Sequence, residues 1–169
     1  MPAYPHCLHN GEIIPLEQAR LPVASKAVFF DYGVYESLKV IKGKCFYPEF
    51  HVERLFESVE AIGATLPYSR EQLLEFIQKT IEANKLDNAL LRVVFYAKTD
   101  VDDPAFFIYA LGLTFYSEKY YSRGHTAVFY QGERFLPESK SMNLLLNYLA
   151  YEKAQRAGAI DALLVDAQE

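Results

Sequence analysis

Tryptophan is absent from this chain of 169 residues, and there are only two cysteines, Cys7 and Cys45. Two cysteines are too few for a fold held by a disulfide framework, so we expect both to be free thiols in or near strands. No apolar run reaches the roughly 18 residues that span a bilayer. The N-terminus, MPAYPHCLHNGE, has neither the basic start nor the apolar stretch of a signal peptide. We therefore expect a cytoplasmic protein.

Basic residues are fewer than acidic ones, 17 against 22. The formal net charge is −5, and no stretch gathers the run of basic residues that would follow a phosphate backbone. Nucleic acid is therefore not an expected partner. Aromatic residues, in contrast, are abundant, with 12 Phe and 13 Tyr. This is more than a small core needs, and the surplus favours an interface or a ligand cavity.

The first part of the chain has the pattern of an antiparallel sheet. Asn10-Gly11 can supply the positive φ angles of a tight turn between CLH and EIIPL, which predicts a hairpin. Lys42-Gly43 predicts a second hairpin within VYESLKVIKGKCFYP by the same reasoning. Two later apolar runs, LLRVVFYA and AFFIYALGLTFY, are separated by TDVDDP and are predicted to be central strands of the same sheet.

Two amphipathic helices are predicted between these strands. From Phe50 the apolar residues follow a helical period that ends at Gly63, and their stripe consists of Val52, Leu55, Phe56, Val59 and Ile62. A second helix is predicted over residues 69–84, where Ser69 and Gln72 resemble a capping box. Both helices can pack on the sheet. The sequence thus predicts an α+β N-terminal domain over residues 1–118.

A polar segment, SEKYYSRGH, follows, and we predict a linker at residues 119–126. Beyond it, TAVFY is predicted to be a strand, MNLLLNYLAYEKAQRAG a helix closed by Gly158, and IDALLVD another strand. This single strand-helix-strand unit over residues 127–169 is shorter than a typical self-sufficient domain. We therefore expect the second domain to be incomplete.

One lysine lies where the strand-to-helix connection of this unit is predicted. Lys140 occurs in PESKSMNLL, where Pro137 stops any preceding element and Ser139 or Ser141 can cap the following helix. A lysine amine attacks a carbonyl only when neutral, which near pH 7 requires burial or a neighbouring cation to lower its pKa from about 10.4. On these residues alone, a lysine in a cavity and a solvated lysine near a helix start both remain open.

Two groups of potential metal ligands are weaker. In HCLH, strand periodicity would place Cys7 and His9 on one face and His6 on the other, with no fourth ligand nearby, so no metal site is predicted. The acidic residues after Thr99 lack the glycine and terminal glutamate of a calcium loop, and we interpret them as a solvated turn before Pro104.

Two blocks of the sequence resemble one known family. The run KSMNLLLNYLAYEKAQRAGAIDALLVD, which begins at Lys140, resembles the signature of class IV pyridoxal-phosphate (PLP) enzymes, the family of D-amino-acid and branched-chain aminotransferases. FFDYGVYESLKVIKGKCFYPEFHVERLFES resembles the N-terminal block of the same family. The two blocks stand in the family's order, and the likeness covers almost the whole chain. The resemblance implies that Lys140 binds the cofactor aldehyde.

The resemblance also implies roles for three other residues. Arg54 matches the arginine that binds the PLP phosphate, and a guanidinium is a planar fork of donors suited to phosphate oxygens. Without the resemblance, Arg54 is a polar-face helix residue beside Glu53 and Glu57. Tyr35 matches a tyrosine that faces the substrate carboxylate, with a packed strand aromatic as the alternative. Lys98 falls where substrate-binding residues lie in the family, although YAKTDVDD lacks the expected arginine-containing pattern.

The implied function is a PLP-dependent aminotransferase that transfers an amino group between an amino acid and a 2-oxo acid and works as a homodimer. Leu145 stands where branched-chain enzymes usually have tyrosine, so KSMNLL is closer to the D-amino-acid version. An aminodeoxychorismate lyase-like enzyme and a catalytically silent interaction fragment are the alternatives. In the family, a glycine turn and a strand with the glutamate that pairs with the cofactor's pyridine nitrogen follow IDALLVD. Glu169 does not match that glutamate, so we expect a truncated PLP-binding domain with impaired activity.

Overall fold

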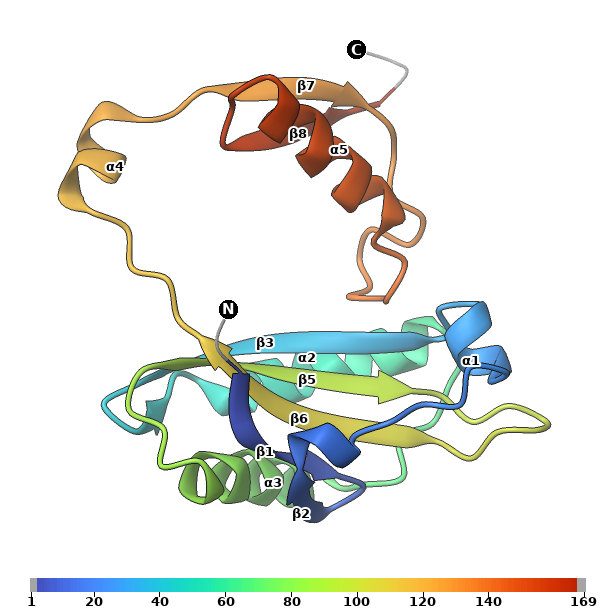
Figure 1. The fold of residues 1–169 in the computed structure, drawn as a ribbon. Helices are drawn as coiled ribbons and strands as arrows, with labels where there is room; N and C mark the ends of the chain where they lie inside the picture. The colour runs from blue at the N-terminus through green and yellow to red at the C-terminus, as the bar shows by residue number, and fades with distance from the viewer. Residues whose placement is uncertain (1–2, 167–169) are drawn as a thin grey trace. The chain divides into compact units, whose positions relative to one another are not determined.

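The computed structural model describes residues 3–166 (Figure 1). The contacts divide the chain into two compact units. The first runs to Leu113 and also includes Glu138–Met142, whereas the second consists of Thr114–Pro137 and the residues from Asn143 onward. The first unit therefore ends slightly before the domain boundary predicted from the sequence. Residues 167–169, among them Glu169, lie outside the described part of the chain.

The first unit is built on a six-stranded antiparallel sheet with the order β2-β1-β6-β5-β3-β4. The strands are β1 (Ala3–His9), β2 (Glu12–Pro15), β3 (Gly33–Ile41), β4 (Lys44–Cys45), β5 (Ala89–Tyr96) and β6 (Ala105–Gly112). Both predicted hairpins are confirmed. Asn10 and Gly11 have φ angles of 48° and 91° between β1 and β2, and Lys42 and Gly43 have 50° and 73° between β3 and β4.

Helices α2 (Pro48–Ala61) and α3 (Arg70–Ala83) pack on one face of this sheet (Figure 1). The predicted stripes are confirmed, since the core of the unit contains Val52, Leu55, Val59, Leu73, Ile77 and Ile81. The predicted capping box of α3 is also confirmed, because Ser69 Oγ accepts from the backbone of Gln72 and the Gln72 side chain accepts from the backbone of Ser69. Two shorter segments, η1 (Leu16–Gln18) and α1 (Lys26–Phe29), lie between β2 and β3.

The two faces of the sheet differ in composition. Strand alternation turns one set of side chains toward α2 and α3, and these are almost fully buried: Leu38, Leu91, Phe95, Phe106 and Ile108. Each such side chain contributes about 1.5–3 kcal/mol through burial. The alternate residues of the same strands occupy the other face, which α2 and α3 do not cover, and include Tyr35, Arg92, Tyr96 and Tyr109. The aromatic surplus seen in the composition lies partly on this open face.

The second unit contains the predicted strand-helix-strand segment. Strands β7 (Ala127–Gln131) and β8 (Asp161–Val165) are parallel neighbours, and α5 (Leu145–Arg156) connects them. The segment predicted as a linker contains a short helix, α4 (Glu118–Arg123). No helix within residues 3–166 combines the length and the apolar character needed to cross a membrane.

The predicted capping of this helix by Ser139 or Ser141 is wrong. Helix α5 begins only at Leu145, and its N-cap residue, Leu144, makes no side-chain cap hydrogen bond. Ser141 instead forms an antiparallel bridge with Val34 in β3. The backbone around Lys140 is thus used to extend the sheet of the first unit, which a helical periodicity argument does not reveal.

Candidate functional site

The segment that carries Lys140 lies along a free edge of β3. Strand β4 pairs only with Val40 and Ile41, so the first half of β3 has no other strand on that side. Residues 138–142 use this edge: the Tyr35 N–H donates to the Lys140 carbonyl at 3.0 Å, and the Met142 N–H donates to the Gly33 carbonyl at 2.9 Å. All of these residues belong to the first unit.

Helix α2 holds the same segment from a second direction. The Lys140 N–H donates to Ser58 Oγ at 3.1 Å, and Ser58 is only 1% exposed. Both backbone polar groups of Lys140 therefore have protein partners. The position of this lysine is fixed by its own backbone, so its side chain starts from a defined point between β3 and α2.

Gly33 makes the close packing of β3 against β5 possible. A Cβ atom added at Gly33 would come within 2.4 Å of the Phe95 carbonyl oxygen in the neighbouring strand. This is well inside the normal separation of such atoms, so a side chain here would push β3 away from β5. Position 33 therefore requires glycine, because the backbone of β5 occupies the space that a Cβ atom would need.

The Lys140 amine lies over the ring of Tyr35. Its Nζ atom is 4.3 Å from the ring centroid, and the guanidinium carbon of Arg92 is 5.2 Å from the same centroid. Both distances are those of cation–π contacts. The structure thus brings together two residues that the sequence singled out, Lys140 and Tyr35, and adds Arg92, which it did not. A lone arginine within the apolar run LLRVVFYA was the signal for it.

Arg54 lies on α2 one helical turn before Ser58. Residues four apart on a helix share a face, so the Arg54 side chain begins beside the residue that anchors Lys140. Hydrogen bonding to Glu36 is the main factor that raises the pKa of Arg54. The Lys140 backbone and Arg54 therefore both lie along this face of α2.

The Arg54 guanidinium already has a carboxylate partner. Its Nε donates to Glu36 Oε1 at 2.5 Å and its Nη2 donates to Glu36 Oε2 at 2.8 Å, while the Arg54 side chain is half exposed. Burial alone would raise the pKa of Glu36, but the hydrogen bonds and charges of Arg54 and His51 outweigh it and hold that pKa below its ordinary value. Glu36 is therefore a carboxylate near neutral pH, and Arg54 is firmly oriented.

Lys98 lies elsewhere. It is exposed and lines a hollow together with Tyr32, Gly63 and Pro104, beyond the end of β5. Among the described contacts, none joins it to Tyr35 or Lys140. Arg92 is the cation that β5 places next to Tyr35.

The open face of the sheet has a hollow near Lys140. Its volume is about 410 Å³, and its walls are the residues Leu16, Ala19, Arg20, Leu21, Val94, Tyr96, Phe107, Tyr109, Leu111 and Met142. Met142 is two positions from Lys140, and the lining is mostly apolar and aromatic. A hydrocarbon group of a small ligand fits such a surface.

Three of the other polar side chains that the sequence offered as metal ligands have structural partners. His9 stacks on Phe107 with a centroid distance of 4.4 Å. Asp100 pairs with Lys26, and Asp102 accepts a hydrogen bond from Thr99. Within residues 3–166, no group of three or more His, Cys, Asp or Glu side chains is arranged to hold a metal ion. Both cysteines are free thiols, as predicted, Cys7 buried in β1 and Cys45 half-buried in β4.

The fold and this donor set define a class of protein. Residues 33–169 match the sequence profile of the family described as amino-transferase class IV. The chain belongs to this family, whose enzymes use PLP, as predicted from the two sequence blocks. Its N-terminal α+β architecture is that of the family.

Among curated proteins, the chain is similar to D-alanine aminotransferases. It is 28% identical to that of Listeria monocytogenes serovar 1/2a (strain ATCC BAA-679 / EGD-e) over 170 residues, which cover 93% of this chain and 58% of the relative. For the Bacillus licheniformis protein the values are 29%, 94% and 59%. The chain thus spans less than two thirds of the length of these relatives.

Among solved structures, it is similar to branched-chain aminotransferases. The enzyme from Thermoproteus uzoniensis with norvaline has a TM-score of 0.86 at 22% identity, covering 99% of this chain and 61% of that one. The Escherichia coli enzyme has a TM-score of 0.85 at 20% identity, covering 98% and 60%. At these identities the likeness shows the fold.

The residues of the site fit the cofactor of the family. A lysine amine, an arginine with part of its guanidinium unoccupied and a tyrosine lie in one region of the first unit. An aldehyde requires the first, a phosphate the second, and a carboxylate or phenolic oxygen can use the third. This combination is what a phosphorylated aldehyde needs.

Proposed function

We propose that this chain carries the lysine-bearing part of a PLP-dependent aminotransferase, which transfers an amino group between an amino acid and a 2-oxo acid. The observation that supports this most directly is the fixed position of Lys140. Its backbone is held by β3 and by Ser58 of α2, which lies one helical turn from Arg54, and its amine lies over Tyr35. In domain terms, residues 1–118 form the N-terminal domain, and those from 127 begin the PLP-binding domain.

The residues of the site have distinct tasks in this proposal. Lys140 Nζ would hold the cofactor aldehyde and would carry a proton to and from the substrate Cα. Arg54 binds the phosphate through the part of its guanidinium that Glu36 leaves free. Bound PLP supplies an electron sink for the negative charge that develops at the substrate Cα.

The substrate carboxylate is assigned to Tyr35 and a cation beside it. Sequence position suggested Lys98 as that cation, but Arg92 is the cation 5.2 Å from the Tyr35 ring. The Arg92 Nε atom is buried and has no hydrogen-bond partner within the described residues. A planar guanidinium with a free donor is the usual partner for a carboxylate. The apolar hollow beside Met142 then receives the substrate side chain.

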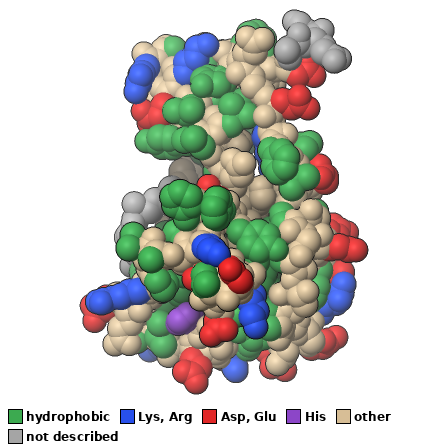
Figure 2. All heavy atoms as spheres, turned by 90° about the vertical axis from the view of Figure 1, so that its right-hand side faces the viewer, with side chains coloured by type: hydrophobic (Ala, Val, Ile, Leu, Met, Phe, Trp, Pro, Cys, Tyr) green, Lys and Arg blue, Asp and Glu red, His purple; other side chains and the backbone are tan. Residues whose placement is uncertain are grey.

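We also propose a homodimer in the cytoplasm. The surface around α1 exposes hydrophobic side chains (Figure 2), and Phe29 and Phe30 are 79% and 70% exposed. Exposed aromatic pairs of this kind are typical of an interface with another protein surface. Two free thiols support a reducing compartment. Sedimentation equilibrium tests the dimer: a single monomer mass across a wide concentration range contradicts it.

Covalent capture of PLP tests the proposed function. The chain is incubated with PLP and reduced with borohydride, and the modified lysine is identified by peptide mass mapping. We expect one dominant modification, at Lys140, and its loss in Lys140→Ala. Lys39→Ala is the matched control, because Lys39 is an exposed lysine on the same strand as Tyr35. Equal modification of several exposed lysines contradicts the proposal.

The reaction type is tested separately. D-alanine and 2-oxoglutarate are added to the PLP-loaded chain, and pyruvate is measured. Formation of pyruvate only when 2-oxoglutarate is present supports transamination. Elimination products from an amino substrate without an acceptor identify a lyase, and covalent capture with no turnover identifies a catalytically silent chain.

A further inference from the structure

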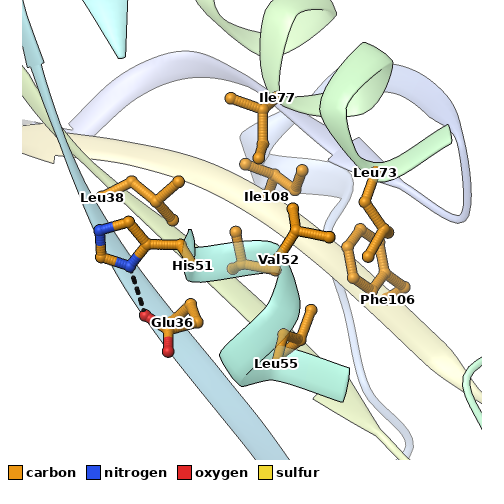
Figure 3. Close-up of a pocket in the computed structure, with 10 residues that line it drawn as sticks. Glu36, Leu38, His51, Val52, Leu55, Leu73, Ile77, Phe106 and Ile108 are labelled. Atoms are coloured by element: carbon orange, nitrogen blue, oxygen red, sulfur yellow. Dashed lines mark hydrogen bonds and ion pairs between the residues drawn. The ribbon is translucent and has the colours of Figure 1, made fainter. Parts of the chain in front are cut away.

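Glu36 occupies an unusual place for a carboxylate. It lies on the same face of β3 as Val34 and Leu38, the face that packs against the helices, and it is 1% exposed. Figure 3 shows it facing His51 of α2 amid apolar side chains of both helices and of β6. A charge at such a position is strongly unfavourable unless other groups compensate it.

The compensation is complete. Glu36 Oε1 accepts from Arg54 Nε, while Oε2 accepts from Arg54 Nη2 at 2.8 Å, from His51 Nδ1 at 2.8 Å and from the Ser37 N–H at 3.2 Å. The adjoining cavity has a volume of about 10 Å³, which is room for no more than a single water molecule. This cavity therefore has no room for a phosphate beside Glu36 and His51.

The contact between His51 and Glu36 shows which imidazole nitrogen of His51 carries a proton. A carboxylate only accepts hydrogen bonds, so Nδ1 of His51 must carry the proton that it donates to Glu36. The same Nδ1 lies 3.4 Å from Arg54 Nη2, which is also a donor, so these two nitrogens do not bond to one another. His51 acts on the carboxylate, and the carboxylate acts on Arg54.

Glu36 also decides which part of Arg54 is free. A guanidinium has two edges that can each bind an oxyanion through two parallel N–H bonds. Glu36 occupies the edge formed by Nε and Nη2. The edge formed by Nη1 and Nη2 remains for another anion. Since Glu36 is anchored by His51 and Ser37, Arg54 cannot turn without breaking a buried charge pair.

We propose that Glu36 and His51 are positioning residues that aim the Nη1–Nη2 edge of Arg54 at the cofactor phosphate. This inference rests on the proposed function and goes beyond it by assigning phosphate affinity to two residues that do not touch the phosphate. Charge alone predicts the opposite effect, because a nearby carboxylate repels a phosphate. Removal of the Glu36 charge should therefore weaken phosphate binding if Glu36 positions Arg54, and should strengthen it if only its charge matters.

The same helix provides a matched control. Glu53 binds Arg70 in the same two-bonded manner, with distances of 2.5 and 2.9 Å, but both side chains are half exposed. Glu53→Gln removes the same unit of charge from the residue next to Arg54. It leaves the buried Glu36 pair in place.

The experiment compares PLP with pyridoxal, which has the aldehyde but no phosphate. Dissociation constants for capture by Lys140 are measured by absorbance, and the pyridoxal-to-PLP ratio isolates the contribution of the phosphate. We expect Glu36→Gln to reduce this ratio about tenfold or more, the equivalent of one charge-assisted hydrogen bond. Glu53→Gln should leave it unchanged or raise it slightly. Pyridoxal affinity itself should change little.

His51 gives an independent test that does not alter the buried carboxylate. His51→Leu removes the Nδ1 donor, whereas His51→Asn keeps an N–H near that position. We expect the ratio to fall several-fold in His51→Leu and to recover in His51→Asn, which a loss of packing alone would not produce. Circular dichroism melting curves establish which variants are folded. If Glu36→Gln does not fold, the two His51 variants decide.

The outcomes separate this inference from the proposed function. An undiminished ratio in folded Glu36→Gln and His51→Leu overturns the positioning role while PLP capture at Lys140 stands. If the wild-type chain captures neither aldehyde, the proposed function fails, and inorganic phosphate is titrated against the NMR signal of the Arg54 Nε–H. A signal that shifts in the wild type and not in His51→Leu still supports the inference, and one that does not shift in the wild type ends it.

Discussion

Ser58→Ala is the sharpest test of how Lys140 is held. Ser58 Oγ accepts the Lys140 N–H at 3.1 Å in a position that is 1% exposed, so alanine leaves that N–H without its partner. The two other backbone bonds of the segment, between Tyr35 and Lys140 and between Met142 and Gly33, remain. The change therefore loosens the anchoring of Lys140 without removing the lysine.

The magnitude follows from one hydrogen bond and one buried donor. Loss of a neutral bond costs about 1 kcal/mol, and a buried N–H left unpaired costs up to about 3 kcal/mol. Alanine favours a helix interior over serine by about 0.5 kcal/mol, which offsets part of this. We expect a net destabilisation of about 1–2 kcal/mol, and roughly tenfold slower capture of PLP by Lys140, since about 1.4 kcal/mol corresponds to tenfold.

Ser69→Ala is the matched control. It removes the N-cap hydrogen bond of α3 and should cost about 1 kcal/mol as well. Residue 69 has no described contact with Lys140, so the rate of PLP capture should stay at the wild-type value. Urea denaturation measures stability, and stopped-flow absorbance measures capture. Equal capture rates in the two variants, at equal loss of stability, refute the view that Ser58 positions Lys140.

Three further predictions concern packing, acid and thiol reactivity. Gly33→Ala should lower the free energy of unfolding by about 3 kcal/mol or more in urea denaturation, because its Cβ would meet the Phe95 carbonyl. Gly63→Ala, which has open space but a φ of 69°, should lower it by only about 1 kcal/mol. Folding lowers the pKa of Glu36, so its carboxylate stabilises the fold fully above the ordinary pKa of 4.5, and this stabilisation is lost as the pH falls through the pKa of the folded state. Thermal melting at acid pH should show this loss of stability in the wild type and a smaller loss in Glu36→Gln. Burial, and secondarily the charge of Glu49, raises the pKa of Cys45 to about 11, so about one Cys45 thiol in a thousand is ionised at pH 8. Iodoacetamide should therefore label Cys45 rapidly only after the protein is unfolded.

Local pattern was sufficient for most elements of the first unit. The turns at Asn10-Gly11 and Lys42-Gly43 depend on φ angles that the residues themselves favour, and the stripes of α2 and α3 depend on spacing along one helix. The family followed from two blocks of sequence and is confirmed. Such features require no knowledge of which distant segments meet.

Contacts between distant segments were not accessible in the same way. The predicted serine cap before α5 was wrong because residues 138–142 pair with the edge of β3, a choice that depends on β4 being short. Arg92 was missed because its role depends on facing Tyr35 from the next strand. Glu36 and His51 were also missed, since a carboxylate in a strand predicts an exposed position unless its buried partners are known.

The sequence by itself determined the hairpins, the two amphipathic helices and the strand-helix-strand segment, and it singled out the lysine that we propose to bind the cofactor, because each is encoded by neighbouring residues. Only the tertiary structure decided that Ser58 anchors Lys140, that Arg92 lies beside Tyr35 and that Glu36 binds Arg54. The physical reason is that these contacts join residues far apart in the chain. Their energies depend on burial and orientation, which exist only after the sheet and α2 have packed together.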